Sequence, residues 1–166
     1  MTNRIDDFII ITEVDRGPVF AEALFKRKYR VRVPDFRHHV VAFWKRDGGA
    51  FVPVSYVHFT DCGDIMLIGG ACTDGELLRT MSEAQRAAID EDGGINLAVT
   101  RYCLTRFGPR CDAVFGHCGD ARSWDILSRC GFERVREPYL IARWSRPLED
   151  ARRLEMIEKA TTFAPF

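Results

Sequence analysis

Two residues able to move a proton, His117 and Cys118, lie at the end of a short and mostly apolar run. The run extends from Asp112 to His117. Such a run is typical of a buried strand. An imidazole has an ordinary pKa that suits a general base near neutral pH. The neighbouring thiol could act as an acid, or as a nucleophile activated by a histidine. A histidine beside a buried strand is often only a hydrogen-bonded structural residue, so both interpretations stay open.

A helix is predicted directly after these residues. Gly119 and Asp120 end the apolar run, and Asp is a favourable N-cap, so we expect the helix to begin at Ala121. Gly131 fits the left-handed residue that ends a helix. A strand that runs straight into a helix places backbone N–H groups and a positive dipole end at the junction, which favours an anion. Arg122, on the first turn, would add positive charge. An ordinary strand–helix unit without a ligand fits the same pattern.

A pair of glycines, Gly69 and Gly70, interrupts the apolar strand predicted at Ile65 to Thr73. Glycines inside such a strand indicate a bulge, or a close approach by another backbone or a ligand. An extended amide chain can pair with an open strand edge of this kind. A packing bulge without a ligand is the alternative.

The hydrophobic pattern predicts an α+β fold with a mixed sheet in a single domain, residues 1–166. Strands are expected at Asp7–Thr12, His39–Lys45, Phe51–Thr60, Ile65–Thr73, Asp112–His117 and Pro138–Trp144. Helices are expected from Pro18, after Asp74, after Ser82, at Ile95–Phe107, from Ala121 and at Leu148–Lys159. Phe8 through Thr73 would form an antiparallel meander. The strands ending at Thr73 and His117 would then pair in parallel through a right-handed crossover helix at Ile95–Phe107.

Composition narrows the class of protein further. The 166 residues are 46% hydrophobic and 29% charged, and 24 basic residues balance 24 acidic ones. A net charge of zero gives no support for a nucleic acid or an anionic membrane as a partner. We find no apolar run long enough for a membrane span and no signal-peptide core at the N-terminus, so we expect a cytoplasmic protein.

The six cysteines lack the close-paired spacing that is typical of zinc sites. They occur at positions 62, 72, 103, 111, 118 and 130. Because the chain is long enough for a real core and shows no export signal, we expect reduced thiols, neither disulfides nor a metal site.

The segment from Asp120 to Phe132 carries a family resemblance. It reads Asp-Ala-Arg-Ser-Trp-Asp-Ile-Leu-Ser-Arg-Cys-Gly-Phe and resembles the closing segment of the GNAT acetyltransferase superfamily, Asn-x-x-Ala/Ser-x-x-Leu/Phe-Tyr-x-x-x-Gly-Phe. Ser123 and the final Gly-Phe match. Asp120 stands in place of the usual Asn, and Leu127 stands where many members carry the Tyr that protonates the departing thiolate of coenzyme A. The resemblance extends from about Phe8 to Trp144.

The resemblance implies a GNAT-like fold and transfer of an acyl group from acetyl-CoA or another acyl-CoA to an amine of a small molecule or a protein. In that fold the bulged strand binds the pantetheine arm, and a glycine-rich loop before the crossover helix binds the pyrophosphate. The implied cofactor-binding residues are Gly69, Gly70, Ala71, Cys72, Gly93, Gly94, Ile95, Asn96, Asp120, Arg122 and Ser123. The candidates for proton transfer near the expected cleft are Asp74, His117 and Cys118.

Two departures from the family pattern support an alternative hypothesis. Asp90 to Asp92 places three carboxylates beside the expected pyrophosphate, where Glu91 replaces a basic or amide residue. Leu127 removes the usual proton donor. The chain would then be a GNAT-shaped ligand-binding or assembly module that has lost coenzyme A binding and catalysis. The sequence does not name the acceptor or the acyl chain, and it leaves a homodimer open.

Overall fold

A parallel strand pair joined by one long helix stands at the centre of the fold. The computed structural model describes residues 4–136 and 138–163. In it, β4 (Ile65–Thr73) pairs in parallel with β5 (Ala113–His117), in a register that runs from Ile65↔Ala113 to Ile68↔Gly116. The crossover contains α4 (Ile95–Phe107). The predicted parallel pair and its crossover helix are therefore confirmed.

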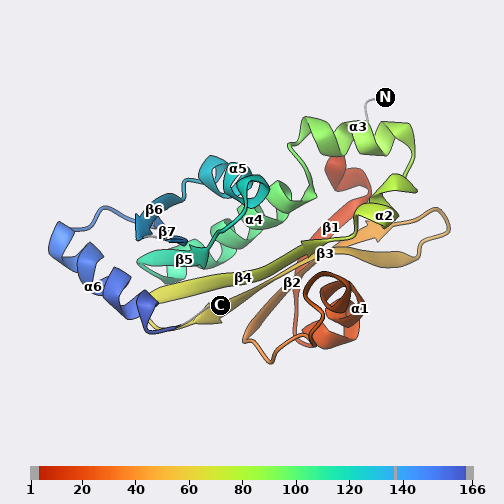
Figure 1. Ribbon diagram of the computed structural model, residues 1–166. Helices are drawn as coiled ribbons and strands as arrows, with labels where there is room; N and C mark the ends of the chain where they lie inside the picture. Colours follow the sequence, from red (N-terminus) through yellow and green to blue (C-terminus); the bar gives the residue numbers. More distant parts are fainter. Residues whose placement is uncertain (1–3, 137, 164–166) are drawn as a thin grey trace. The chain divides into compact units, whose positions relative to one another are not determined.

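The sheet has seven strands in the order β1-β2-β3-β4-β5-β7-β6 (Figure 1). The remaining strands are β1 (Ile9–Val14), β2 (His38–Lys45), β3 (Phe51–Asp61), β6 (Glu133–Arg136) and β7 (Leu140–Trp144). Antiparallel pairing joins β1 to β2, β5 to β7 and β6 to β7. The mixed sheet expected from the sequence is confirmed. The short strand β6 was not among the predicted strands.

The helices begin where local chemistry favours them. They are α1 (Gly17–Tyr29), α2 (Gly75–Arg79), α3 (Glu83–Glu91), α5 (Ala121–Arg129) and α6 (Asp150–Thr161), with 3-10 turns at Ile5–Asp7 and Gly108–Arg110. Ser82 and Gln85 form the predicted capping box at the start of α3. Asp120 caps α5, and Gly131 has the left-handed φ of 86° expected after the end of that helix.

The chain divides into two compact units, and β3 and β4 each contribute to both. The first contains residues 4–58 and 70–99. In its core, α1 supplies Ala21, Leu24 and Phe25, which pack with Val41 of β2 and Tyr56 of β3. Burial of a large apolar side chain contributes roughly 1.5–3 kcal/mol, so this cluster is a main source of stability for the unit. The prediction that the whole chain is a single domain stays a prediction.

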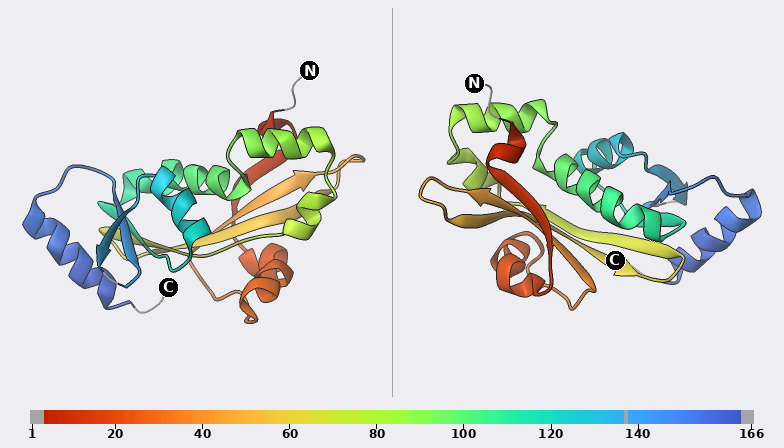
Figure 2. Two further views of the ribbon diagram at one scale, coloured as in Figure 1. Left: turned by 45° about the horizontal axis from the view of Figure 1, so that its top comes forward. Right: turned by 180° about the vertical axis from the view of Figure 1, so that it is seen from behind.

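The second unit contains residues 59–69 and 100–163, apart from 137. Its core forms where α6 packs on one face of β4, β5 and β7. Met156 and Ala160 of α6 belong to one cluster with the alternate strand residues Ile65, Leu67, Ala113, Phe115, Leu140 and Ala142. Spacing by two places these strand residues on the same face of the sheet, which is the face that α6 covers. Both views in Figure 2 show α6, in blue, next to the strands of this unit.

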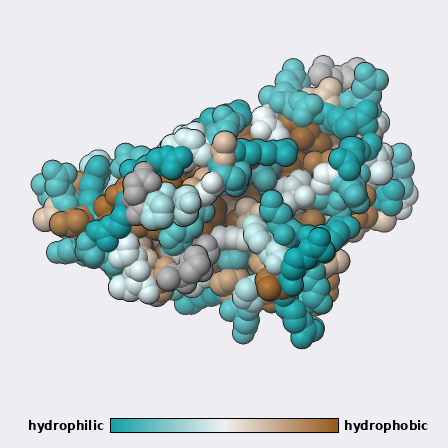
Figure 3. Space-filling view, in the orientation of Figure 1, coloured by the Kyte–Doolittle hydropathy of each residue, from teal (hydrophilic) through white to brown (hydrophobic). Residues whose placement is uncertain are grey.

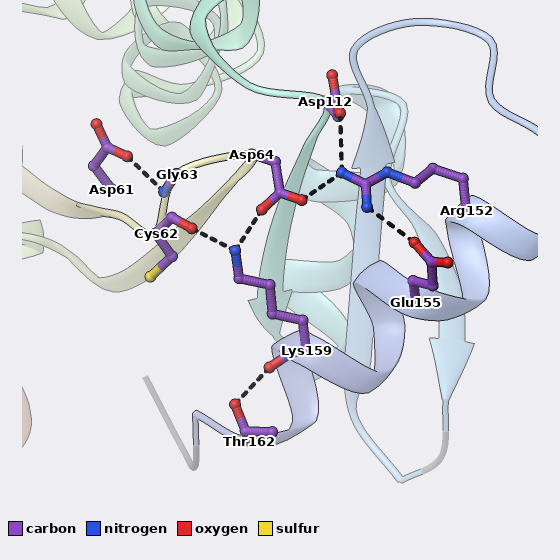
Figure 4. Close-up of polar contacts among 9 residues, drawn as sticks. All are labelled: Asp61, Cys62, Gly63, Asp64, Asp112, Arg152, Glu155, Lys159 and Thr162. Atoms are coloured by element: carbon purple, nitrogen blue, oxygen red, sulfur yellow. Dashed lines mark hydrogen bonds and ion pairs between the residues drawn. The ribbon is translucent and has the colours of Figure 1, made fainter.

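Polar contacts hold α6 in place at the turn between β3 and β4 (Figure 4). Lys159 pairs with the Asp64 carboxylate, and its Nζ also donates to the Cys62 carbonyl oxygen over 2.6 Å. Arg152 Nη2 lies 2.6 Å from Asp64 Oδ2 and 3.7 Å from Asp112 Oδ2. Lys159 is the main cause that lowers the pKa of Asp64 below its ordinary 3.8. Asp64 therefore joins Lys159 and Arg152 of α6 to the turn before β4.

Hydrophilic residues predominate over the surface in the view of Figure 3, and hydrophobic residues are interspersed among them. Within the described part of the chain, the helices are too short or too polar to cross a bilayer. The cytoplasmic location and the oligomeric state stay predictions.

Candidate functional site

The glycine bulge of β4 forms because one position has no room for a side chain. Gly70 has a left-handed φ of 60°. A Cβ added there would lie 2.3 Å from Cε1 of His58 and 2.7 Å from Cε2 of Phe25. Both the conformation and the close approach therefore require glycine. The ladder between β4 and β5 has its last pair at Ile68↔Gly116, directly before the two glycines.

His58, which the sequence analysis did not single out, lies against this bulge. It is 3% exposed, and its ring stacks on Phe36 with centroids 3.4 Å apart and planes 9° from parallel. Neither ring nitrogen has a hydrogen-bond partner among the described residues. Burial lowers the pKa of His58 to about 3, so the imidazole is neutral near pH 7. The available signal was its spacing of two from Tyr56, which places both side chains on the same face of β3.

Beyond the bulge, two backbone carbonyl groups of β4 already accept hydrogen bonds. The Tyr29 hydroxyl donates to the Ala71 carbonyl oxygen over 2.7 Å, and Ser55 Oγ donates to the Cys72 carbonyl oxygen over 3.0 Å. Both carbonyl groups thus already have partners inside the protein. Burial raises the pKa of the Cys72 thiol to about 12, so this cysteine remains protonated and unreactive.

Asn96, predicted to belong to the pyrophosphate loop, turns its side chain to the sheet. Its Oδ1 accepts from Thr73 Oγ1 over 2.7 Å and lies 3.1 Å from Ser55 Oγ. Ser55 is fully buried. A buried hydroxyl that lost such a partner would cost roughly 1–3 kcal/mol. Asn96 therefore fixes the first turn of α4 to β3 and β4.

The two loop glycines, Gly93 and Gly94, end α3. Their φ angles are 89° and 99°. The Gly93 N–H donates to the Asp90 carbonyl oxygen over 3.0 Å, and the Gly94 N–H donates to the Ile89 carbonyl oxygen over 2.8 Å. These bonds satisfy carbonyl groups at the end of the helix. Both glycine N–H groups are thus engaged inside the protein.

Asp74, at the end of β4, has a structural role that occupies both carboxylate oxygens. Its Oδ1 accepts from the N–H groups of Glu76 and Leu77 over 3.1 and 3.0 Å, which caps α2. Its Oδ2 pairs with Arg27 of α1. Both carboxylate oxygens are therefore engaged in holding α1 and α2.

The strand–helix junction in the second unit gathers the other predicted residues. Asp120 Oδ1 accepts from the Ser123 N–H over 2.9 Å, and the Cys118 thiol donates to the Asp120 carbonyl oxygen over 3.6 Å. Burial raises the pKa of Cys118, so its thiol is protonated near pH 7. His117 is exposed, and partial burial of its ring lowers its pKa below 6.5. Arg122 is exposed on the first turn of α5.

The predicted site residues thus fall into two sets that belong to different units. One set comprises Gly70, Ala71, Cys72, Asp74, Gly93, Gly94, Ile95 and Asn96, and the other comprises Gly69, His117, Cys118, Asp120, Arg122 and Ser123. All six cysteines are free thiols. Over residues 4–136 and 138–163, no three His, Cys, Asp or Glu side chains are grouped to hold a metal ion.

This strand order, with a parallel pair, a crossover helix and a glycine bulge, is the fold of the GNAT N-acetyltransferases, and solved structures confirm it. The ribosomal-protein-S18-alanine N-acetyltransferase from Escherichia coli matches with a TM-score of 0.60 at 9% identity, over 86% of this chain and 97% of that chain. A chain of the NatC complex bound to Gag peptide and CoA matches with a TM-score of 0.58 at 11% identity, over 86% of this chain and 99% of that chain.

Other matches are to longer chains. The N-acetylglutamate synthase from Neisseria gonorrhoeae, complexed with coenzyme A and L-arginine, matches with a TM-score of 0.56 at 13% identity, over 82% of this chain and 33% of that chain. The protein spans only 44% of a matching chain from Pyrococcus horikoshii. No protein-family model matches the sequence, and no curated protein matches it. At these identities the comparisons establish the fold.

Proposed function

We propose that the protein is a GNAT-type N-acyltransferase, which transfers an acetyl or other acyl group from acyl-CoA to an amine of a small molecule or a protein. The observation that carries the proposal is the end of the β4–β5 ladder at Ile68↔Gly116, followed at once by the bulge at Gly70. From there β4 continues to Thr73. Its backbone is suited to pair with the two amides of a pantetheine arm. Two of the solved structures with this fold hold coenzyme A.

The pyrophosphate would be bound by the first turn of α4. A helix N-terminus supplies unpaired N–H groups and a positive dipole end, which together favour phosphate. Because the N–H groups of Gly93 and Gly94 are engaged in ending α3, they are not the groups that would bind it. Arg122, on α5 of the second unit, stays a prediction for this site, and the N-terminus of α5 is already capped by Asp120.

His117 is the side chain best suited to remove the proton from the attacking amine. Its lowered pKa keeps the imidazole neutral near pH 7, so that it can accept a proton. The amine nitrogen would then attack the thioester carbonyl, whose oxygen a backbone N–H of the bulged strand would polarise. The C–S bond breaks and the coenzyme A thiolate leaves. The raised pKa of Cys118 makes it a weak proton donor, and Leu127 has no proton to give, so water would protonate the thiolate.

Release of free coenzyme A thiol from acetyl-CoA, measured with a panel of small amines and peptides with free N-termini, tests this function. We expect amine-dependent release by the wild type and a loss of about 100-fold in kcat/KM for His117→Gln, the usual effect of removing a general base. Cys118→Ala is the matched control at the neighbouring position, and it should retain activity. If His117→Gln were as active as the wild type, the base would have to lie elsewhere.

A second candidate function has its own support. The engaged N–H groups of Gly93 and Gly94, together with the acidic run Asp90 to Asp92, disfavour a pyrophosphate and favour a ligand-binding or assembly module without coenzyme A. Direct binding separates the two candidates. The module predicts no acetyl-CoA complex in native mass spectrometry at millimolar ligand, whereas the acyltransferase predicts a one-to-one complex.

A further inference from the structure

An open hollow of about 290 Å³ lies in the second unit, and none of the residues assigned above to acyl-CoA line it. It forms where the second half of α4 meets the end of α5 and β7, and the helices α4 and α5 lie side by side in both views of Figure 2. Its lining residues are Arg101, Leu104, Thr105, Arg129, Cys130 and Arg143. Half of the lining residues are therefore arginines.

The hollow carries more positive charge than its neighbours neutralise. Arg129 has one weak partner, Asp125, at 3.8 Å. Arg143 Nε donates to the Cys130 carbonyl oxygen over 3.1 Å, a neutral partner. The Arg101 side chain has neither an ion pair nor a hydrogen bond in the part of the chain that the structure describes. The C-terminal end of α5 contributes about half a negative charge. Among the described residues, the three guanidinium groups thus have one carboxylate partner, which leaves a positive excess.

The three arginines line the same hollow, next to Cys130. Burial raises the pKa of the Cys130 thiol, and the charges of Arg101, Arg143 and Arg129 partly oppose this rise. The hydrogen bond to the Cys130 carbonyl oxygen fixes the Arg143 guanidinium at this place. Leu104, which is buried, supplies an apolar wall, and Thr105 supplies a hydroxyl group.

We propose that this hollow binds a phosphoryl group, either as inorganic phosphate or as a small phosphate monoester. The planar fork of arginine donors matches the oxygens of phosphate, and three arginines that line one hollow suit a dianion. A volume of about 290 Å³ is at the lower end of ligand cavities, so the organic part must be small. The organic part of the ligand would pack against the side chain of Leu104. The site goes beyond acyl transfer and does not depend on it.

Calorimetry with inorganic phosphate and with glycerol 3-phosphate, at constant ionic strength, tests the proposal. We expect saturable binding at millimolar concentration or below. Arg101→Gln should raise the Kd for phosphate at least tenfold, which is about 1.4 kcal/mol of binding free energy. The substitution breaks no ion pair or hydrogen bond of the Arg101 side chain among the described residues. Arg106→Gln is the matched control, because Arg106 is exposed on the same helix but does not line the hollow. Tighter binding of glycerol 3-phosphate would assign the site to a monoester, and tighter binding of phosphate to the free ion.

Alkylation of Cys130 by iodoacetamide locates the bound ion. Peptide mass spectrometry should show that phosphate slows alkylation of Cys130 in the wild type but not in Arg101→Gln, with Cys62, also partly exposed, as the internal reference. The proposal is overturned if 20 mM phosphate gives no saturable heat, or if Arg101→Gln binds phosphate as the wild type does. Acetyl-CoA binding is measured separately, so a failure of the proposed acyltransferase function leaves this result intact.

Discussion

Gly70 of β4 and His58 of β3 lie so close together that each limits the size of the side chain at the other position. A Cβ at Gly70 would come within 2.3 Å of the His58 ring, and the φ of 60° at Gly70 already disfavours any other residue. The buried imidazole thus fills the space that a side chain at the bulge would need. The bulge on which acyl-CoA binding would depend is coupled to the packing of the core beneath it.

Gly70→Ala should therefore destabilise the protein by about 2–4 kcal/mol, from overpacking against His58 and from backbone strain. Urea unfolding followed by circular dichroism measures the loss. In the double variant His58→Ala, Gly70→Ala, the Gly70→Ala change should cost at least 1 kcal/mol less than it does in the wild type, because the clash with His58 is gone and only the one with Phe25 remains. Additive losses would show that the two residues are not coupled.

The buried neutral His58 predicts a dependence of stability on pH. Above its ordinary pKa of 6.5 the imidazole is neutral in both the folded and the unfolded chain. As the pH falls from 6.5 towards the folded pKa of about 3, only the unfolded chain binds the proton, so stability decreases. The loss attributable to this group is at most about 1.4 kcal/mol per pH unit.

His58→Leu removes this titration. The free energy of unfolding of the wild type, relative to the variant, should decrease between pH 6 and pH 4 and stay constant above pH 7.5. A difference that stays flat across the whole range would mean that His58 binds its proton at the same pH in the folded and the unfolded chain.

Asp64→Asn should loosen α6. It removes the carboxylate that pairs with both Lys159 and Arg152, and we expect a loss of about 1–2 kcal/mol at pH 7, as for hydrogen bonds to charged groups that are partly exposed (Figure 4). Because the folded pKa of Asp64 is lowered, its contribution is complete above the ordinary value of 3.8 and is lost as the pH falls through the lowered pKa.

Thermal unfolding at pH 7 and pH 2.5 measures both effects. The gap in Tm between the wild type and Asp64→Asn should be present at pH 7 and narrow at pH 2.5. Glu155→Gln is the control, because Glu155 also pairs with Arg152 but lies on α6 itself and does not join the helix to the sheet. An equal loss for both variants would contradict the role given to Asp64.

Sequence patterns predicted the elements whose signals are local. The bounds of β4 and α4 agree with the prediction, because apolar residues at spacings of two and of three to four mark them and polar or glycine residues end them. Asp120 and Gly131 were recognisable because capping depends on a few adjacent residues. β6 escaped prediction because Glu-Arg-Val-Arg has one apolar residue and pairs only with β7 at the sheet edge.

The candidate site was less accessible to prediction, because its chemistry depends on tertiary contacts. The sequence indicated a bulge at Gly70 but not the ring of His58, twelve positions earlier, that requires the glycine. It placed Gly93 and Gly94 correctly before α4, but it did not reveal that their N–H groups bond to carbonyls of α3. Asp74 resembled a base until its two oxygens were seen to cap α2 and pair with Arg27.

Calorimetric titration with acetyl-CoA tests the central claim most directly. If the bulged strand and the first turn of α4 bind the cofactor, the wild type should form a one-to-one complex with a Kd below 1 mM, and desulfo-CoA, which lacks only the thiol, should bind with similar affinity. No measurable binding at millimolar acetyl-CoA, by a protein shown to be folded, would contradict the account.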